Sequence, residues 1–369
     1  STPYMDLIAS TGILGTVRTI PPGLPPGSSV GNMSLMGLDP EKYFTGRAPL
    51  EAKALGIPLE AEDIAFRCNL VKLSKNGRGE VMEDYSGGRP SSDQAGDCIE
   101  LLDRKLGDEE FRFYQGVSYR NLLVWKNGRK KVDREGINLT PPHDISGEPV
   151  ENYRPRGEGG EKLDDLQERA KQALRARPCI ANGIWFWGQG IRPEVPSIQE
   201  RYNLEGSVIS AVDLIKGIGA YAGLKPVEVK GATGFIDTNY MGKVSAAVEN
   251  LRENSIVFLH VEAPDEASHE GDIELKLRAI EKIDELVLSP IVDYLSTEEG
   301  SRIMLVTDHI TGIESRTHER GAVPFAISEL SEANERESVD FTEEEASRTG
   351  VEFDSGSALM NRFIHGEVD

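Results

Sequence analysis

The sequence IVFLHVEAPDEASHEGD, residues 256–272, places acidic and histidine side chains directly after a short apolar run. Residues 256–259 have the length and composition of a buried strand, and Asp265 and His269 follow on what reads as a helical turn. Residues four apart lie on one face of a helix, so both side chains can point to the same place. Ligands of α/β folds bind at the carboxyl ends of strands. The stretch therefore predicts a strand, a helix and a metal site where they meet.

A second stretch has the same arrangement. IMLV, residues 303–306, precedes Asp308 and His309 in VTDHI, and His318 in SRTHERG follows after a loop. Adjacent side chains at a strand end can address different ions, and His318 can return to the first. Mixed carboxylate and imidazole ligands favour Zn or Mn over Ca, which prefers oxygen ligands. The five residues predict a pair of divalent cations, able to clamp the attacking and leaving oxygens of an in-line displacement.

A Gly/Pro-rich turn near the start, PPGLPPGSSVGN (residues 21–32), displays Ser28. Alone, this serine could be an ordinary turn residue. Together with five metal ligands it is a candidate nucleophile, because an adjacent metal or base activates a serine hydroxyl. The combination indicates metal-assisted phosphoryl transfer. We expect His260, inside its strand, to be structural or to support the ligands.

Apolar strands alternate with helices through the last half of the chain. This alternation predicts an α/β protein with a doubly wound, mainly parallel sheet. One helix has a 3.6-residue apolar period, which predicts a single core-facing stripe of Ile273, Leu277, Ile280, Ile283 and Val287. The expected strands are 184–187, 208–212, 227–229, 256–259 and 303–306.

A smaller α+β unit interrupts this pattern. Strands at 66–73, 111–114 and 119–125 surround a helix at 91–106, capped by Ser92 or Asp93. We predict a core of residues 1–63 and 179–369 and an inserted domain of 64–178. Residues 1–15 read as a helix ended by Gly12, and the Gly-rich segment 147–160 reads as a mobile linker.

The composition limits the partners. The formal net charge of −21 argues against nucleic acid and anionic membranes, and an anionic substrate would need a local basic pocket. No apolar run approaches the length of a membrane span, and no signal peptide is visible, so we expect a cytoplasmic protein. Cys68, Cys98 and Cys179 have no CxxC spacing, which favours unpaired thiols in a reducing compartment. The oligomeric state is left open.

Six motifs carry a resemblance that covers nearly the whole chain. They are IPPGLPPGSSVGNMSLMGLDPEKYFTGRAPLEA, DIAFRCNLV, IWFWGQG, GATGFIDTNYMGK, HVEAPDEASHEGD and TDHITGIESRTHERGAVPF. The chain resembles the cofactor-independent (2,3-bisphosphoglycerate-independent) phosphoglycerate mutases of the archaeal type, within the alkaline phosphatase superfamily. The serine turn and the last two motifs are its most specific parts.

The resemblance implies an isomerase of glycolysis and gluconeogenesis that interconverts 3-phosphoglycerate and 2-phosphoglycerate. Ser28 would be phosphorylated during the cycle, and the inserted domain would act as a lid. Two divalent ions are implied, with Mn expected first and Mg, Co or Zn also possible. One ion would be held by Asp265, His269 and His318, and the other partly by Asp308 and His309.

The sequence departs from the family pattern at two places. The family begins with a strand ending in an Asp-Gly motif whose aspartate completes the second metal site, and we expect that motif to precede Ser1. The family also reads Ser-Asp at the nucleophile and Thr-Pro after Asp-His, where this chain has Ser28-Ser29 and Ile310-Thr311-Gly312. Neither change removes a predicted ligand.

A small substrate carrying phosphate and carboxylate needs cationic side chains, and arginine suits both groups. The candidates are Arg47, Arg67, Arg120 and Lys216, with His143 and Asp144 for proton transfer. Three alternatives stay open. A phosphomonoesterase or phosphonate hydrolase could use the same scaffold, a sulfatase would need its own modified motif, and a non-catalytic homologue could bind metal or ligand.

Overall fold

The computed structural model describes residues 1–77, 79–132, 136–175, 180–330 and 338–366. Its contacts divide the chain into two compact units. Unit 1 comprises Ser1–Phe44 and Glu194–Asp369, and unit 2 is Thr45–Pro193. Unit 2 therefore lies in sequence between the two segments of unit 1, whereas the domain that we predicted as inserted spans residues 64–178.

The described residues of unit 1 form three sheets. One has the strand order β10-β13-β1-β14, one has the order β8-β7-β9, and β11 pairs with β12. The strands are β1 (Ile13–Val17), β7 (Gly206–Ile209), β8 (Lys225–Val227), β9 (Ile256–Leu259), β10 (Ile303–Val306), β11 (Ile310–Thr311), β12 (His318–Glu319), β13 (Val323–Ser328) and β14 (Glu352–Phe353).

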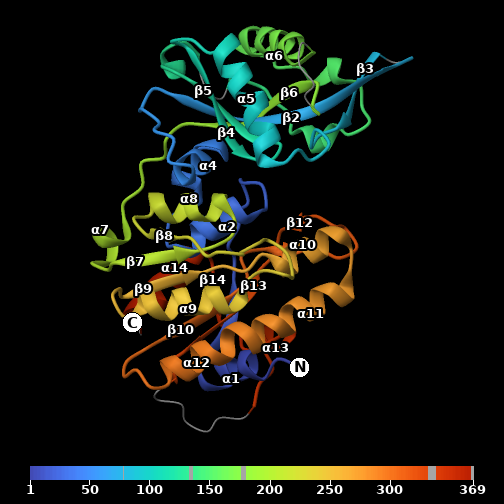
Figure 1. The fold of residues 1–369 in the computed structure, drawn as a ribbon. Helices are drawn as coiled ribbons and strands as arrows, with labels where there is room; N and C mark the ends of the chain where they lie inside the picture. The colour runs from blue at the N-terminus through green and yellow to red at the C-terminus, as the bar shows by residue number, and fades with distance from the viewer. Residues whose placement is uncertain (78, 133–135, 176–179, 331–337, 367–369) are drawn as a thin grey trace. The chain divides into compact units, whose positions relative to one another are not determined.

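The prediction of a mainly parallel sheet is wrong for unit 1. Strand β7 is parallel to β8 and β9, but β13 is antiparallel to both β1 and β10. The alternation of strands and helices is real, and Figure 1 shows α8 (Asp213–Tyr221) and α9 (Tyr240–Leu251) on opposite sides of β7. Strand direction, however, depends on long-range pairing that the alternation does not encode. Unit 1 is a mixed α/β fold.

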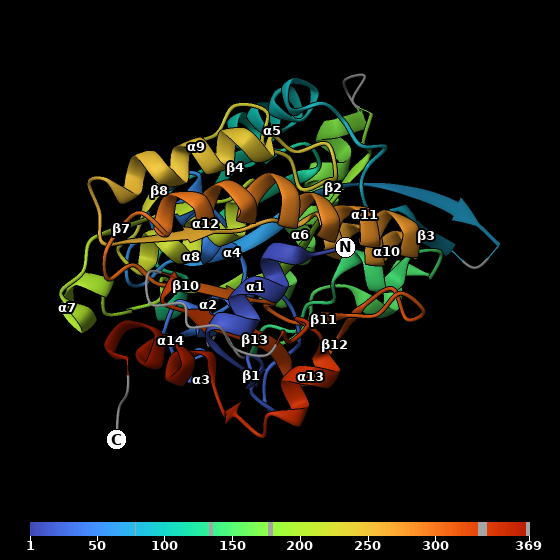
Figure 2. The same ribbon diagram turned by 90° about the horizontal axis from the view of Figure 1, so that it is seen from below.

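The other helices of unit 1 surround these sheets (Figures 1 and 2). They are α1 (Pro3–Thr11), α2 (Ser28–Leu35), α3 (Pro40–Tyr43), α7 (Ile198–Tyr202), α10 (Ala263–Glu270), α11 (Ile273–Ile283), the π-helix η5 (Asp284–Leu288), α12 (Ser289–Leu295), α13 (Glu343–Arg348) and α14 (Gly356–His365).

Two local predictions in unit 1 need correction. Helix α1 ends at Thr11 with Gly12 as its C-cap, as expected, but residues 13–17 then form the unpredicted strand β1. Only glycine fits at position 12, because a side chain there would meet the carbonyl of Ile327 at 1.9 Å. The apolar stripe of α11 is core-facing only at its end. Ile273 and Leu277 are 59% and 56% exposed, whereas Ile280 and Ile283 pack against a core cluster and Val287, in η5, is buried.

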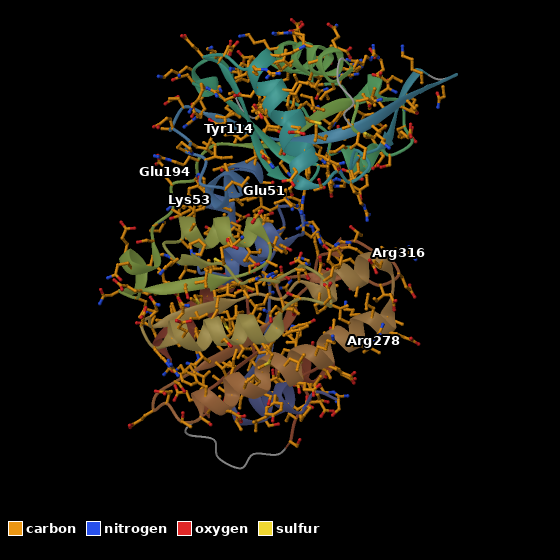
Figure 3. All side chains as sticks on the ribbon, viewed as in Figure 1. Glu51, Lys53, Tyr114, Glu194, Arg278 and Arg316 are labelled. Atoms are coloured by element: carbon orange, nitrogen blue, oxygen red, sulfur yellow. The ribbon has the colours of Figure 1, made fainter. Side chains whose placement is uncertain are left out.

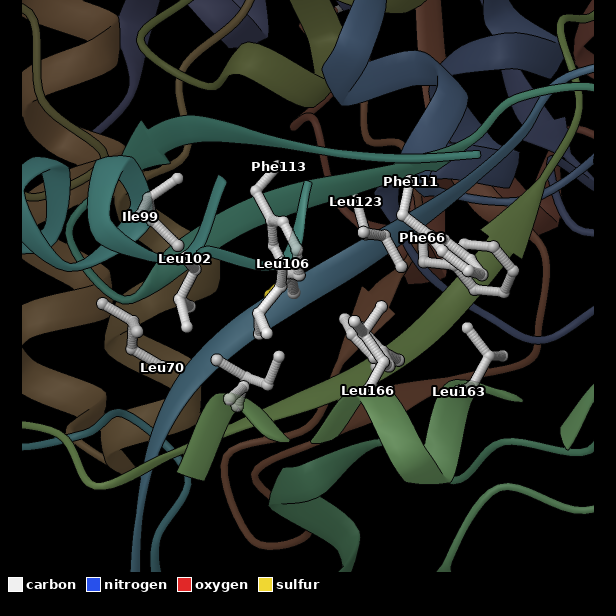
Figure 4. Close-up of a cluster of buried hydrophobic side chains, with 14 of the residues drawn as sticks. Phe66, Leu70, Ile99, Leu102, Leu106, Phe111, Phe113, Leu123, Leu163 and Leu166 are labelled. Carbon is white, nitrogen blue, oxygen red and sulfur yellow. The ribbon is translucent and has the colours of Figure 1, made fainter. Parts of the chain in front are cut away.

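Unit 2 has a five-stranded sheet. Four of its strands follow the order β3-β2-β5-β4, and the fifth, β6, also pairs with β2. Its core lies between the sheet and helices α5 and α6, where Phe66, Leu102, Leu123 and Leu166 pack together (Figure 4). The elements are α4 (Ala48–Ala54), β2 (Ile64–Asn76), β3 (Gly79–Asp84), α5 (Ser92–Leu106), β4 (Phe111–Val117), β5 (Arg120–Trp125), η1 (Gly128–Lys130), η3 (Pro142–Ile145), η4 (Val150–Tyr153), α6 (Gly160–Arg175) and β6 (Gly183–Gly190).

Three observations on unit 2 change the predicted picture. Strand β6, expected in the core sheet, pairs antiparallel with β2, which explains the displaced boundary. Helix α5 is capped by Ser91, one residue before the expected caps, in a capping box with Gln94. The predicted linker is part of the unit, since it holds η4 and Arg154, whose guanidinium lies 2.9 Å from Asp164.

The cysteines also differ from expectation. Cys68 is a buried thiol whose pKa is raised by burial, whereas Cys98 is disulfide-bonded rather than unpaired. Cys179 lies outside the described residues. Among the described helices, none combines the length and apolar character needed to cross a membrane.

Candidate active site

The predicted nucleophile stands at the first residue of α2. Ser28 Oγ lies 2.9 Å from Nε2 of His309, which comes from the turn after β10. Gly27, the residue before it, has φ of 150°, a conformation open to glycine, and a side chain there would lie 3.1 Å from His318 Nδ1. Glycine therefore lets the turn bring the serine close to two predicted ligands.

Helix α2 is tied to the end of β10 by direct contacts. Asn32 Nδ2 donates to Asp308 Oδ2 at 2.7 Å and to the Ser28 carbonyl at 3.1 Å. A side chain at Gly31 would meet the Asp308 carbonyl at 2.4 Å. The hydroxyl of Thr19 donates to the same carbonyl at 2.6 Å. The serine helix and the Asp308 strand end are therefore held in a fixed relation.

The five predicted metal ligands lie in one region of unit 1. His269 Nε2 is 3.2 Å from Asp265 Oδ2 and 3.1 Å from His318 Nε2. Ligand atoms of Asp265, His309 and His318 all lie within 4.8 Å of one another. Asp308 Oδ2 is 3.4 Å from His309 Nε2. This close group of three combines Asp265 and His318, which the resemblance assigns to one ion, with His309, which it assigns to the other.

The environment strongly shifts the pKa values of two of these side chains, Asp265 and His269. Burial alone would raise the pKa of Asp265, but hydrogen bonds from His269, His318 and Thr311 hold it far below its ordinary value. The hydrogen bond to Asp265 raises the pKa of His269 to about 9, against the opposing effect of burial. Imidazole nitrogens that converge on an ionised carboxylate form the mixed N/O donor set that Zn and Mn accept. The residues therefore fit a divalent cation.

A second polar group lies beside this region. His260 Nδ1 is 3.1 Å from Ser210 Oγ, and its Nε2 is 3.2 Å from Glu262. Burial lowers the pKa of His260 to about 4, so the ring is neutral. Lys243 is fully buried and donates to the His260 carbonyl at 2.9 Å. These contacts fix the chain at the end of β9, just before Asp265.

The predicted arginines of unit 2 lie near one carboxylate. It belongs to Glu51 of α4, which is labelled in Figure 3. Arg47 Nε donates to Glu51 Oε1 at 3.0 Å. Arg67 Nε lies 3.1 Å from Glu51 Oε2 and forms an ion pair there without a hydrogen bond. Burial alone would raise the pKa of Glu51, but Arg67 and Arg47 hold it below its ordinary value. One carboxylate thus balances part of a strongly positive cluster.

The indole of Trp187 packs against the arginines of this cluster. Arg67 Cζ lies 4.3 Å from its ring centroid, and the indole N–H donates to Asn69 at 3.0 Å. The His143 ring packs edge-on at 5.2 Å, and its Nε2 is 3.6 Å from Asp144. Burial lowers the pKa of His143, and the two arginines add to that effect. The sequence-predicted pair of His143 and Asp144 therefore lies beside Arg67.

The two remaining cationic candidates contact other side chains. The Arg120 guanidinium is 5.8 Å from the ring of Tyr119 and close enough to lower the pKa of Glu51. Lys216, in unit 1, is paired with Asp213 at 2.9 Å and Glu228 at 2.8 Å. Its charge is therefore balanced locally, and a role in substrate binding stays a prediction.

Sequence reasoning missed four residues that organise these clusters: Asn32, Glu51, Trp187 and Thr311. Asn32 had a readable signal, since it lies one helical turn after Ser28. Glu51 likewise lies four residues after Arg47. Trp187 and Thr311 act through partners distant in sequence, which no local pattern indicates.

Comparison with known proteins agrees with this description. A profile of the family described as 2,3-bisphosphoglycerate-independent phosphoglycerate mutase matches residues 9–179. The chain is 46% identical to the mutase of that name from Methanosarcina mazei, over 95% of this chain and 88% of the relative. It is 45% identical to that of Methanosarcina barkeri, over 98% and 92%.

Solved structures give the same fold. A protein of Pyrococcus horikoshii matches with a TM-score of 0.78 at 25% identity, covering 100% of this chain and 91% of the other. A cofactor-independent phosphoglycerate mutase of Thermoplasma acidophilum matches with a TM-score of 0.63 at 22% identity, covering 99% and 91%. On the sequence identities, this chain belongs to the family of 2,3-bisphosphoglycerate-independent phosphoglycerate mutases.

Proposed function

We propose that the protein interconverts 3-phosphoglycerate and 2-phosphoglycerate through a phosphoserine at Ser28, without 2,3-bisphosphoglycerate. The names of the relatives support the isomerase class. The observation that carries the proposal is the position of Ser28. Its hydroxyl, at the N-terminus of α2, is 2.9 Å from His309 Nε2 and close to Asp308 through Asn32.

Each protein group has a distinct task in this reaction. Ser28 Oγ attacks the phosphorus of the bound ester, and its hydroxyl proton faces His309 Nε2. The ester bond between phosphorus and the glycerate oxygen breaks, and that oxygen takes up a proton. The N-terminus of α2 carries a partial positive charge that favours the phosphoryl oxygens. Asn32 keeps the helix and Asp308 in register during the transfer. The phosphoryl group then returns to the other hydroxyl of the retained glycerate.

The ligand set is assigned to two divalent ions. Asp265, His269 and His318 would hold one, and Asp308 with His309 would contribute to the other. When bound, such ions supply positive charge that stabilises phosphoryl oxygens and lowers the pKa of a nearby hydroxyl. Metal binding requires neutral imidazoles and ionised carboxylates. The lowered pKa of Asp265 keeps its carboxylate ionised.

We assign substrate recognition in part to unit 2. Arg47, Arg67 and Arg120 provide planar guanidinium groups, the preferred partners of carboxylate and phosphate. His143 and Asp144 are the candidates for moving protons at the glycerate hydroxyls. The proposal also gives the inserted unit the role of a lid, because a phosphoserine open to water would hydrolyse and leave a phosphatase.

The test follows conversion of 3-phosphoglycerate by the whole protein with Mn²⁺ and no 2,3-bisphosphoglycerate, with free phosphate measured in parallel. Isomerisation without phosphate release is expected. Phosphate release alone would make the protein a hydrolase on the same site. A protein that neither isomerises the substrate nor releases phosphate would favour a non-catalytic homologue.

The nucleophile is tested by Ser28→Ala, with Ser29→Ala as the matched control on the same helical turn. We expect Ser28→Ala to abolish isomerisation with nearly unchanged metal content, because no predicted ligand is removed. Ser29→Ala should keep turnover. An active Ser28→Ala variant would exclude the phosphoserine pathway.

A further inference from the structure

Thr311 lies between two of the predicted metal ligands and belongs to neither ligand set. It is 7% exposed and ends the short strand β11. Its hydroxyl donates to Asp265 Oδ1 and lies 3.1 Å from His309 Nδ1. One side chain therefore bridges a ligand that follows β9 and a ligand that follows β10.

The hydrogen-bonding capacity of these groups fixes the direction of both contacts. An ionised carboxylate only accepts, so the single proton of the Thr311 hydroxyl goes to Asp265. The hydroxyl oxygen must then accept from His309, which places a proton on Nδ1. The carbonyl of Ile310, which also only accepts, lies 3.4 Å from the same Nδ1. The Thr311 oxygen and the Ile310 carbonyl therefore both require a proton on His309 Nδ1.

The backbone holds Thr311 in this position. It pairs directly with His318 in the two-residue ladder of β11 and β12. Its carbonyl accepts from Lys276 Nζ at 3.0 Å, which anchors it to α11. The hydroxyl therefore approaches Asp265 and His309 from a backbone fixed on two sides.

We infer that Thr311 is a positioning residue that fixes the tautomer of His309. With the proton on Nδ1, the lone pair of Nε2 points to the place where Ser28 Oγ lies at 2.9 Å. The same lone pair is the one a divalent cation would take. The hydroxyl thus links Asp265 to Ser28 through the His309 ring. This inference rests on the proposed site: the Nε2 lone pair accepts from Ser28 in the metal-free protein, and the same lone pair is available to a divalent cation when one binds.

The matched pair of variants is Thr311→Val, which removes the hydroxyl at similar size, and Thr311→Ser, which keeps it. The first readout is ¹⁵N NMR of histidine-labelled, metal-free protein, which reports which ring nitrogen carries the proton. The chain has 6 histidines, so the spectrum is sparse, and His309→Gln assigns the signal. We expect the Nδ1-protonated form in the native protein and in Thr311→Ser, and a mixed population in Thr311→Val.

The second readout is Mn²⁺ affinity, measured by titration calorimetry or by the loss of the free Mn²⁺ EPR signal. Residues that orient a ligand contribute about 10–100-fold to metal affinity. We expect a loss of that size in Thr311→Val and a near-native affinity in Thr311→Ser. Neither measurement uses turnover, so both stand if the protein proves not to be a mutase.

Three results would overturn the inference. The first is a native His309 protonated on Nε2, or on both nitrogens at neutral pH, which needs no variant to fold. The second is an unchanged tautomer and Mn²⁺ affinity in Thr311→Val. The third is an equal loss in Thr311→Ser, which would assign the effect to packing of the methyl group.

Discussion

Replacing Glu51 by Gln should destabilise unit 2 strongly, because the change leaves Arg67 buried without its counter-ion. The Arg67 side chain is 4% exposed and that of Glu51 14% exposed, so water cannot replace the lost carboxylate. Breaking a buried pair by removing one partner costs about 3–5 kcal/mol. Arg47, with a side chain 35% exposed, adds at most about 1 kcal/mol.

Part of the charge stays compensated after the substitution. The guanidinium of Arg67 keeps its place over Trp187, at 4.3 Å, and a desolvated cation–π contact is worth about 2 kcal/mol. We therefore expect the lower end of the range, about 3 kcal/mol. With a urea slope of roughly 2 kcal/mol per molar, the unfolding midpoint falls by about 1–2 M.

Tryptophan fluorescence isolates this effect. The 3 tryptophans of the chain, Trp125, Trp185 and Trp187, all belong to unit 2, so the signal reports unfolding of that unit. The control is Asp165→Asn, which breaks an exposed pair with Arg169 on α6 and should cost less than about 0.5 kcal/mol. If Glu51→Gln shifts the midpoint no more than this control does, the assigned energy of the buried pair is refuted.

Two further predictions concern the metal site and a helix cap. In the metal-free protein the raised pKa of His269, about 9, keeps the ring protonated near neutral pH, so a bound ion must displace that proton. Mn²⁺ affinity should rise with pH up to about 9, with proton release visible by calorimetry in buffers of different ionisation heat; a flat profile would contradict the role of Asp265 in holding the proton. Ser91→Ala removes the capping box with Gln94 and should cost unit 2 about 1 kcal/mol by fluorescence. The equivalent change in unit 1, Ser197→Ala, removes the capping box of α7 and should leave the fluorescence midpoint unchanged.

Local signals predicted much of the fold. Strands β9 and β10 have the bounds expected from their apolar runs, and α5 (Ser92–Leu106) matches the helix predicted at 91–106 within one residue. The same runs placed the ligand residues in one region, because a strand end fixes where the following side chain begins. Periodicity and residue type were sufficient where the deciding contacts are short-range.

Long-range pairing decided what the sequence left unresolved. Strand β6 could not be assigned to unit 2 from its composition, because an apolar strand reads the same in either sheet. The segment at 147–160 is rich in glycine, yet Arg154 ties it to α6 through the carboxylates of Asp164 and Glu168, a contact that the composition of the segment does not indicate. No local sequence pattern indicates the role of Thr311, because its two hydrogen-bond partners, Asp265 and His309, are brought together only by folding.

The pairing of β1 with β13 has a consequence for the order of folding during synthesis. Ile13 lies opposite Ile327, so β1 can pair with β13 only after all the residues between them have been synthesised. Unit 2 is a single continuous segment and can collapse much earlier. Contacts between distant residues form slowly, because the intervening chain must first be brought together. Until β13 has been synthesised, the apolar strand β1 lacks this partner, and an unpaired apolar strand is a site for aggregation and for chaperone binding.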